Sequence, residues 1–241
     1  MSKKYSMNIL ITGCSKGLGY GLSRFYLEGG HKVFGISRSG NTELENYPGF
    51  SHLGQDLSDF DSLRKNIPTF LGEIKTLDLA ILNAGILNDI KDMRNTGIDE
   101  IRHVMDVNVW ANKVLIDIVF SELDEIKQLI AISSGAAVSG SRGWNAYALS
   151  KATLNMLIDL YSREHKKTHF IAMAPGLIDS GMQDYISGLP DEIDFPVVQK
   201  LKKAKGTEQM PPPGSAAEIV ANAIEKALNY ESGSFVDVRQ L

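Results

Sequence analysis

The chain has 241 residues, a net charge of −4, an isoelectric point of about 5.8, and 43% hydrophobic and 22% charged residues. These values are typical of a soluble globular chain that is long enough for one large domain with its own apolar core. The sequence has no long basic run, which argues against nucleic acid as a partner, and no apolar stretch long enough to cross a bilayer, which argues against a membrane protein.

The single cysteine, Cys14, excludes an internal disulfide and favours a reducing compartment. The run Met7–Ile11 already predicts a buried strand, which leaves too few residues ahead of it for a secretory leader. We therefore expect a cytoplasmic location. Cys14 itself is either a reactive thiol or a small residue in a tight turn, and we favour the turn.

Short apolar runs alternate with longer helical patterns along the chain. Strands are expected at Met7–Thr12, Lys32–Ser37, Phe50–Gly54, Leu77–Leu82, Gln128–Ser133, Thr168–Ala174 and Ser234–Val238. Helices are expected at Gly17–Glu28, Ser58–Leu71, Gly97–Leu123, Ala146–His165 and Ser215–Asn229. Most of the strands are continuous apolar runs, as in a parallel sheet covered on both faces. This order predicts an α/β fold with a doubly wound, mostly parallel seven-stranded sheet that binds ligands at the carboxyl ends of its strands.

Two segments interrupt the alternation, and neither has the composition of a domain linker, so we expect residues 1–241 to form one domain. Ser134–Asn145 is rich in Gly, Ser and Ala and predicts a loop. Leu177–Gly214 is long for a connection, and such segments are either binding loops or disordered. We favour a mobile substrate lid at 177–214, although its lysines could equally be a solvated face.

The glycine-rich run Thr12–Gly19 closes the first expected strand and opens the first expected helix. Glycines let a backbone turn tightly and approach a pyrophosphate, which the positive helix N-terminus attracts. The run could be merely a turn, but its place favours phosphate binding. The residues expected to contact a dinucleotide here are Gly13, Ser15, Lys16, Gly17, Leu18 and Gly19.

The second expected strand ends in Ser37-Arg38, where an NAD-binding fold often has an acid for the ribose hydroxyls. An acid would repel a 2′-phosphate, whereas an arginine binds it with paired hydrogen bonds. Arg38 and Lys16 together favour NADP(H) over NAD(H). Asp56, with its neighbour Leu57, follows the third strand and is expected beside the adenine, although capping of the next helix is a rival role for Asp56.

Tyr147 and Lys151 lie four residues apart in an expected helix and therefore share one face. A phenol ordinarily loses its proton near pH ~10, and a neighbouring ammonium lowers that pKa. The pair could exchange a proton with a substrate oxygen. Alone, the spacing is weak evidence, because chance places such a pair in many helices.

From Thr12 to Val238 the chain resembles a short-chain dehydrogenase/reductase. The resemblance is carried, in family order, by the glycine run, Asp56, Asn83-Ala84-Gly85, Asn108, Ser134, Tyr147, Lys151 and Pro175-Gly176. The stretch Gly143–Tyr147 and the overall length are similar to the sepiapterin reductase, benzil reductase and C-factor-like branch. The resemblance implies a single-domain Rossmann fold with helices on both faces of the sheet.

The resemblance also implies roles for residues along the cofactor. Asn83, Ala84 and Gly85 would pass beside the adenosine ribose and stabilise the sheet, although they could form an ordinary strand-end turn. Ile178 and Ser180, after Pro175-Gly176, would contact the nicotinamide carboxamide. Tyr147 and Lys151 would lie at the nicotinamide ribose.

Two further polar residues complete the catalytic set that the resemblance implies. The Asn108 carbonyl would hold a water that connects Lys151 to solvent, although a polar residue within a helix is more often solvent-facing. Ser133 and Ser134 compete to bind the substrate carbonyl. We choose Ser134 because it lies 13 residues before Tyr147, a spacing that is usual in the family.

The expected function is NADPH-dependent reduction of a ketone or aldehyde, with Tyr147 as acid and no metal. The alternatives are NAD(P)-dependent alcohol oxidation and NADP(H) sensing without turnover. A small or aromatic ketone, or a diketone, would suit an apolar pocket under the lid. Residues that could line it, or could simply pack, are Trp144, Met182, Tyr185, Ile186, Leu189 and Phe195. By resemblance we expect a homodimer or homotetramer formed through Gly97–Leu123 and Ala146–His165.

Overall fold

All seven strands join one parallel sheet in the order β3-β2-β1-β4-β5-β6-β7. The computed structural model describes residues 5–72 and 74–241. The strands are β1 (Asn8–Thr12), β2 (Lys32–Ser37), β3 (Phe50–Gly54), β4 (Thr76–Leu82), β5 (Glu125–Ile132), β6 (His169–Ala174) and β7 (Phe235–Asp237). The predicted seven-stranded α/β fold is therefore confirmed. The strand order reverses between β1 and β4, which is where such sheets form a ligand crevice.

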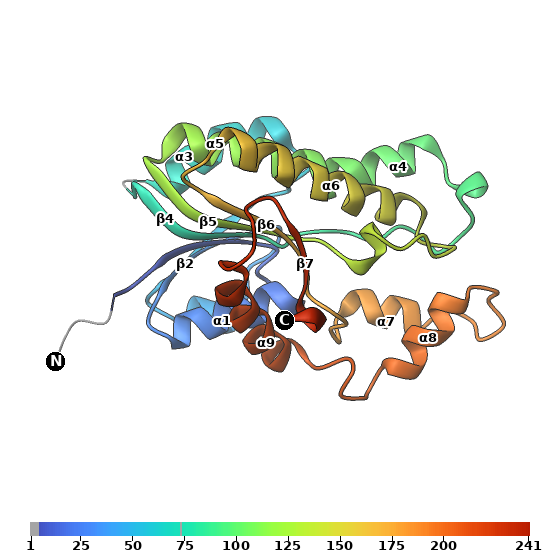
Figure 1. Ribbon diagram of the computed structural model, residues 1–241. Coiled ribbons are helices and arrows are strands. Elements are labelled where there is room, and N and C mark those ends of the chain that lie inside the picture. The colour runs from blue at the N-terminus through green and yellow to red at the C-terminus, as the bar shows by residue number, and fades with distance from the viewer. Residues whose placement is uncertain (1–4, 73) are drawn as a thin grey trace.

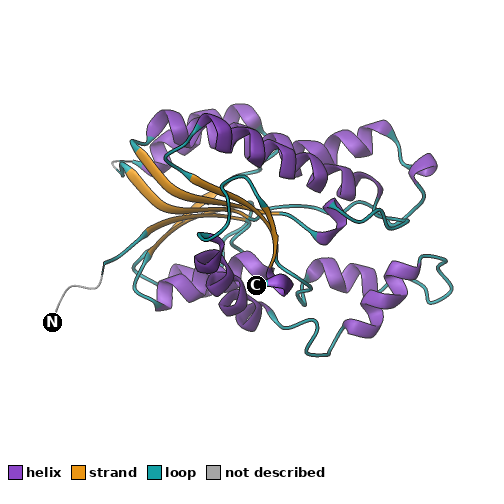
Figure 2. Ribbon diagram, in the orientation of Figure 1, coloured by secondary structure: helices purple, strands orange, loops and turns teal. Residues whose placement is uncertain are grey.

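Helices cover both faces of the sheet, so the molecule has three layers (Figure 1, Figure 2). The α-helices are α1 (Gly17–Glu28), α2 (Thr42–Glu45), α3 (Phe60–Leu71), α4 (Ile98–Met105), α5 (Ala111–Glu122), α6 (Asn145–Glu164), α7 (Gly181–Ser187), α8 (Pro196–Ala204) and α9 (Pro213–Ala227). Figure 1 shows α3, α5 and α6 on one face and α1 and α9 on the other, while α7 and α8 extend beyond the sheet on the side of α1.

The apolar core is divided by the sheet into two parts. Ile9 and Ile11 of β1 face the cluster under α1 and α9, whereas Leu10 between them faces the cluster under α3, α5 and α6. All three side chains are fully buried. Successive residues of a strand point to opposite faces, so a strand between two helical layers must be apolar at every position. That requirement explains the continuous apolar runs in the sequence.

The expected helix Gly97–Leu123 is not one regular helix. It consists of α4, a π-helical segment at Asp106–Trp110, and α5. A π-turn widens the helix by one residue and shifts the carbonyls out of register with the N–H groups. The segment contains Asn108, so the departure from α-geometry falls on a residue of the predicted site.

The segment 177–214, where the sequence predicted no helix, contains α7 and α8. Val198, Leu201 and Ala204 of α8 are buried at helical spacing, and they pack with Ile186 of α7 in a third, smaller apolar cluster. Pro196 is at the first turn of α8, where a proline is tolerated. The segment therefore has a core of its own. Ile186 belongs to that core rather than to a pocket wall.

No helix in the described ranges is both long and apolar enough to cross a membrane.

Candidate active site

The loops that follow β1, β4 and β6 come together at the carboxyl edge of the sheet. A methyl group added at Gly13, after β1, would lie 3.0 Å from the Cα atom of Ala84, after β4. A methyl group added at Gly17 would lie 3.6 Å from the Cβ atom of Ser180, which follows β6. Residues that are far apart in the sequence therefore surround one crevice, as the parallel topology requires.

Tyr147 and Lys151 lie on the first turns of α6, and both are buried, at 8% and 3% exposure. The Lys151 Nζ atom donates a hydrogen bond to the carbonyl oxygen of Ile132, the last residue of β5, at 2.7 Å. The same Nζ atom lies 5.8 Å from the centre of the Tyr147 ring. The strand end thus fixes the ammonium beside the phenol.

Burial shifts the pKa values of both groups. It raises the pKa of Tyr147 above its ordinary value, and a hydrogen bond with the Ser134 side chain partly opposes that rise. Burial also lowers the pKa of Lys151 to about 8, because a charged ammonium is disfavoured away from water. A buried acid and a buried cation with strongly shifted pKa values are typical of a functional site.

The structure separates the two candidate serines. The Ser134 side chain is hydrogen-bonded with Tyr147, and its Oγ atom accepts the Ala136 N–H at 3.1 Å. The Ser133 hydroxyl instead donates to the Oδ1 atom of Asn155 on α6 at 2.5 Å. Of the two, Ser134 is the serine that faces the tyrosine.

Asn108 is fully buried in the π-helical segment, next to Lys151. Its Oδ1 atom accepts the Ile86 N–H at 2.8 Å, and its Nδ2 atom donates to the hydroxyl of Ser150 at 3.0 Å. Its main-chain carbonyl accepts from the Nδ2 atom of Asn112 at 2.8 Å. The Oδ1 atom of Asn112 is buried and has no hydrogen-bond partner among the described residues.

The glycine loop forms a cradle at the start of α1. Gly13 and Gly17 have φ angles of +69° and +57°, which favour glycine. A Cβ atom at Gly19 would lie 2.2 Å from the Gly13 carbonyl oxygen, so the loop folds too tightly for any side chain there. No side chain caps α1, and its first turn has no acid. The open, positive helix end and the bare backbone fit a pyrophosphate.

Of the two residues at the end of β2, Ser37 lies in the interior and Arg38 lies on the surface. Ser37 is buried, and its hydroxyl donates to the Ser39 carbonyl at 2.9 Å while it also contacts Cys14 and His52. Arg38 is exposed. The structure therefore exposes the Arg38 side chain and buries the Ser37 hydroxyl against Cys14 of the glycine loop. Burial raises the pKa of the Cys14 thiol, which fits the reading of Cys14 as a small residue in a turn.

Asp56 does not cap α3, because Asp59 does so by accepting the Ser62 N–H at 3.0 Å. Asp56 instead accepts the Ser58 N–H at 2.9 Å, and this bond lowers the pKa of its carboxyl group. The positive charge of Arg38 lowers it further. Leu57, the neighbour of Asp56, is buried in the core.

Asn83 and Thr12 tie the ends of β4 and β1 together. The Asn83 Nδ2 atom donates to the Thr12 carbonyl at 3.0 Å, and the Thr12 hydroxyl oxygen accepts the N–H groups of Asn83 and Ala84, each at 3.0 Å. The stabilisation of the sheet expected of Asn83 is therefore present. Gly85 packs against Lys151, since a Cβ atom there would lie 3.4 Å from its Nζ atom.

The turn after β6 carries Pro175 and Gly176, and Gly176 has a φ angle of +82°. Ile178 is buried at 9% exposure, and Ser180 precedes α7 without capping it through its side chain. Because Ser180 lies against Gly17, this turn and the glycine loop line the same crevice.

Arg142 joins the loop before α6 to the 177–214 segment. Its guanidinium binds both carboxylate oxygens of Asp92, at 2.6 and 3.0 Å, and the carboxylate of Asp194 at 3.0 Å. The guanidinium also lies 4.9 Å from the centre of the Phe195 ring. The ring of Trp144 lies 5.7 Å from that of Tyr147. The loop before α6 therefore contacts the 177–214 segment through the Arg142–Asp194 ion pair and the contact of Arg142 with the Phe195 ring.

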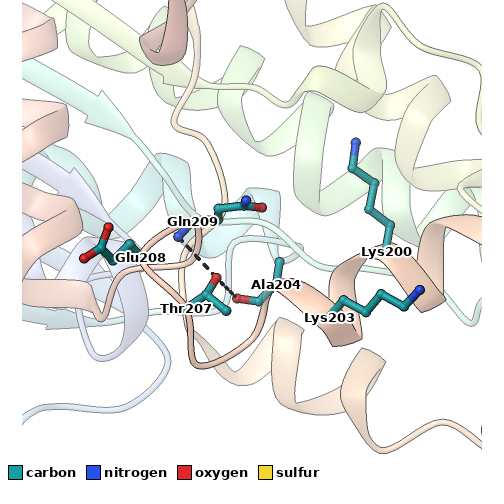
Figure 3. Close-up of a pocket in the computed structure, with 6 residues that line it drawn as sticks. All are labelled: Lys200, Lys203, Ala204, Thr207, Glu208 and Gln209. Carbon is teal, nitrogen blue, oxygen red and sulfur yellow. Dashed lines mark hydrogen bonds between the residues drawn. The ribbon is translucent and has the colours of Figure 1, made fainter.

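A surface hollow lies at the C-terminal end of α8 (Figure 3). Its lining residues are Lys200, Lys203, Ala204, Thr207, Glu208 and Gln209. None of the predicted site residues lines it, so it is not a candidate for the chemistry. In the described part of the chain, no three His, Cys, Asp or Glu side chains gather as metal ligands.

Two buried residues to which the sequence analysis assigned no role contact the site. Asn88 accepts the N–H of Tyr147, and Asn145, two residues before the tyrosine, binds Asn88. Asn88 belongs to none of the motifs quoted above, and Asn145 was quoted only as part of Gly143–Tyr147, without a role of its own. The only signal in the sequence was an asparagine directly after a glycine and a tryptophan, and that signal does not identify a partner.

Comparisons with known proteins agree with this architecture. The family described as short chain dehydrogenase matches residues 7–188. An uncharacterised oxidoreductase of Schizosaccharomyces pombe is 34% identical over 181 residues, which cover 73% of this chain and 72% of the relative. A benzil reductase, (S)-benzoin forming, of Bacillus subtilis is 28% identical over 242 residues, 96% of this chain and 98% of the relative.

Among solved structures, a short-chain dehydrogenase/reductase from Saccharomyces cerevisiae superposes with a TM-score of 0.85 at 24% identity. The match covers 97% of this chain and 96% of that one. The sheet order, the site geometry and the family match therefore lead to one conclusion: the chain belongs to the short-chain dehydrogenase family of oxidoreductases.

Proposed function

We propose that this protein is an NADPH-dependent reductase that converts a ketone or aldehyde to an alcohol. The observation that carries the proposal is the buried Tyr147 phenol, hydrogen-bonded with Ser134 and lying beside the Lys151 ammonium. In this arrangement one hydroxyl orients a carbonyl oxygen, a second hydroxyl protonates it, and a cation stabilises the negative charge that develops.

The cofactor would lie across the carboxyl ends of the strands. The glycine loop and the uncapped start of α1 would hold its pyrophosphate, and Asn83, Ala84 and Gly85 would pass beside the adenosine ribose. Asp56 and Leu57 would adjoin the adenine. Pro175, Gly176, Ile178 and Ser180 would contact the nicotinamide. When bound, the reduced cofactor supplies a hydride to the carbonyl carbon.

The residues of the chain would then complete the reduction by moving a proton. Ser134 would donate a hydrogen bond to the carbonyl oxygen, and Tyr147 would transfer its proton to that oxygen as the negative charge develops. Lys151 would stabilise the resulting phenolate. A water at the Asn108 carbonyl would return the proton. The buried, unpartnered Oδ1 atom of Asn112 beside that carbonyl supports a water there.

The proton-transfer role of Tyr147 is tested by Tyr147→Phe, which removes only the hydroxyl. Loss of a positioned acid typically costs about 10²–10⁴-fold. We therefore expect kcat to fall by about this factor while NADPH binding, followed by fluorescence titration, stays within about twofold. Near-normal turnover of the best carbonyl substrate by the variant would contradict the proposed mechanism.

A screen of carbonyl compounds for NADPH oxidation separates catalysis from the alternative of NADP(H) sensing. Turnover supports the reductase, whereas binding without turnover across a broad panel supports the sensor. Alcohol oxidation with NAD is the other alternative, and the cofactor preference decides it.

The preference for NADPH rests on the exposed Arg38 and on Lys16 at the start of α1. A guanidinium pairs with a 2′-phosphate, and a carboxylate at the same place repels it. We expect Arg38→Asp to weaken NADPH binding much more than NADH binding in titrations of both cofactors. Arg64→Asp, a change of the same charge on α3, is the control. Equal weakening of both cofactors by Arg38→Asp would refute the preference.

The substrate we propose is a small or aromatic ketone or a diketone. Two observations support it: relatives of this chain include a benzil reductase, and aromatic residues such as Trp144 lie beside Tyr147. We further propose that residues 1–241 act as one domain, that 177–214 forms a lid, and that the protein works in the cytoplasm as a homodimer or homotetramer.

A further inference from the structure

The start of α6 is capped by a residue from another part of the chain. The first helical N–H groups have no partner within a helix and need one from outside. The residue before α6, Trp144, supplies no side-chain cap. Instead, the Tyr147 N–H donates to the Oδ1 atom of Asn88 at 2.8 Å, a contact between residues 59 positions apart. Asn88 lies after β4 and is 6% exposed.

The orientation of the Asn88 amide follows from this bond. A backbone N–H can only donate, so Asn88 must present its oxygen to Tyr147 and its Nδ2 atom to the other side. There the Nδ2 atom donates to the Asn145 Oδ1 atom and to the Asp89 carbonyl, each at 2.7 Å. The polar groups of the Asn88 side chain are thus paired within the protein.

Asn145 supports Asn88 from the first position of α6. Its φ angle is +20°, the only positive value among the described residues other than glycine. Asparagine tolerates such a backbone better than most residues. Its side chain is buried and donates to the hydroxyl of Thr96 at 2.6 Å, and that hydroxyl donates to the Asp92 carbonyl at 3.2 Å. Each group in this series therefore donates a hydrogen bond to the next, from the Tyr147 N–H through Asn88, Asn145 and Thr96 to the Asp92 carbonyl.

The carbonyl of Tyr147 is held as well. It accepts a hydrogen bond from Ser150 at 2.7 Å, and Ser150 in turn accepts from Asn108. Asn88 from the loop after β4 thus holds the N–H of Tyr147, and Ser150 of α6, which Asn108 of the π-helical segment holds in turn, binds its carbonyl. A phenol that must meet a carbonyl oxygen within hydrogen-bond reach depends on such fixed placement.

We propose that Asn88, oriented by Asn145, is a positioning residue that sets the place of the Tyr147 hydroxyl relative to Ser134 and Lys151. The inference rests on the proposed function. Asn88 touches no reacting atom, so its loss should reduce kcat and leave substrate and cofactor binding intact. A misplacement of ~1 Å can cost about 10²-fold.

The test compares Asn88→Ala with Asn88→Asp. The alanine removes the acceptor, and we expect kcat to fall about 10²-fold with KM and the NADPH dissociation constant within about twofold of the wild type. Aspartate keeps an oxygen for the Tyr147 N–H. In its neutral form the buried carboxyl donates to the Asp89 carbonyl as the Asn88 Nδ2 atom does. The Asn145 amide can turn to donate to the same oxygen, since the Thr96 hydroxyl can donate in its place. We therefore expect Asn88→Asp to recover most of the lost kcat when the rate is measured at a pH low enough to keep this carboxyl neutral.

Hydrogen exchange provides a readout that does not need turnover. In Asn88→Ala the amides at the start of α6 should exchange faster, while those in the last turns of α6 should not change. Thr168→Val is the matched control, because it removes a buried hydrogen bond to Ile126 at the opposite end of the sheet. It should leave kcat and the exchange at the start of α6 as in the wild type.

The inference is overturned if folded Asn88→Ala keeps its kcat, if Asn88→Asp recovers none of the loss, or if exchange at the start of α6 is unchanged. Should Asn88→Ala fail to fold, Asn145→Gly takes its place, because glycine accepts the positive φ and removes only the amide that orients Asn88. Its kcat should fall in the same way, and an unchanged kcat overturns the inference. If the wild type turns over no carbonyl, the proposed function fails, and the exchange result alone decides the role of Asn88.

Discussion

Burial acts in opposite directions on the pKa values of the two titratable groups at the centre of the site. It raises the pKa of Tyr147 and lowers that of Lys151 to about 8. The lysine therefore loses its proton before the tyrosine does as the pH rises. For a reduction, the active form is the one in which both groups are protonated, because the phenol must donate and the ammonium must stabilise the phenolate.

This order of deprotonation predicts how the reduction depends on pH. We expect kcat/KM for carbonyl reduction to decline as the pH rises through about 8, where Lys151 becomes neutral. A pH profile of initial rates measures the midpoint. In Lys151→Met the ammonium is absent at every pH, so the variant should be slow and should lack this decline. A decline at the same pH in Lys151→Met would show that another group controls the rate.

At the scale of elements, α1 and α9 pack more closely than side chains would allow. A Cβ atom at Gly21 would lie 2.3 Å from the carbonyl oxygen of Pro213, the first residue of α9. Backbone atoms of a helix end cannot move aside as a flexible side chain can. The contact sets the distance between α1 and α9. Because Gly19 of the glycine loop lies on the same helix as Gly21, the contact also bears on where that loop lies.

Gly21→Ala should therefore destabilise the protein, even though alanine is ordinarily the better helix former. Overpacking typically costs ~1–3 kcal/mol, and we expect the free energy of unfolding in urea to fall by about that amount. Gly214→Ala, near the start of α9, is the control, because nothing lies within 4 Å of a Cβ atom there. An unchanged stability in Gly21→Ala would mean that the two helices can move apart without cost.

On the scale of the whole molecule, α6 presents an apolar stripe to solvent. Leu149, Met156 and Leu160 are 45%, 58% and 51% exposed, and their spacing places them on one face of the helix. The opposite face of α6 carries Tyr147 and Lys151 against the sheet. We propose that the stripe meets a second copy of this chain, in line with the expected homodimer or homotetramer.

The oligomer is tested by placing a charge on this stripe. We expect Met156→Glu to lower the mass measured by sedimentation, because a carboxylate buried in an apolar interface lacks a partner. Phe25→Glu, on the exposed face of α1 in the other layer, should keep the wild-type mass. A wild-type mass for Met156→Glu would place any interface elsewhere.

Much of this molecule could be predicted from local patterns. Strands between two helical layers are apolar on both faces, so runs such as Met7–Thr12 could be predicted as strands. Glycine is needed where φ is positive or where backbones touch, as at Gly13 and Gly19. The spacing of Ser134 from Tyr147 identified the serine that now lies against the phenol.

Other features depend on partners distant in the sequence, and local patterns do not contain them. The π-turn at Asn108 and the helices within 177–214 form because of what packs against them. In α8 the apolar residues Val198 and Leu201 have a helical spacing. The neighbouring lysines and prolines are typical of a loop, so no helix was predicted there.

The sequence by itself predicted the parallel α/β fold and a phosphate-binding loop from residue type and short spacing. It predicted the roles of the tyrosine, lysine and serine through the resemblance to a family, because the spacing alone is weak evidence. Only the tertiary structure decided that Tyr147 and Lys151 are both buried, which shifts their pKa values, and that Ser37 turns inward while Arg38 faces outward. It also decided that Asn88 caps the helix of the tyrosine. Burial and long-range hydrogen bonds are properties of the folded packing, and no single segment of the chain carries them.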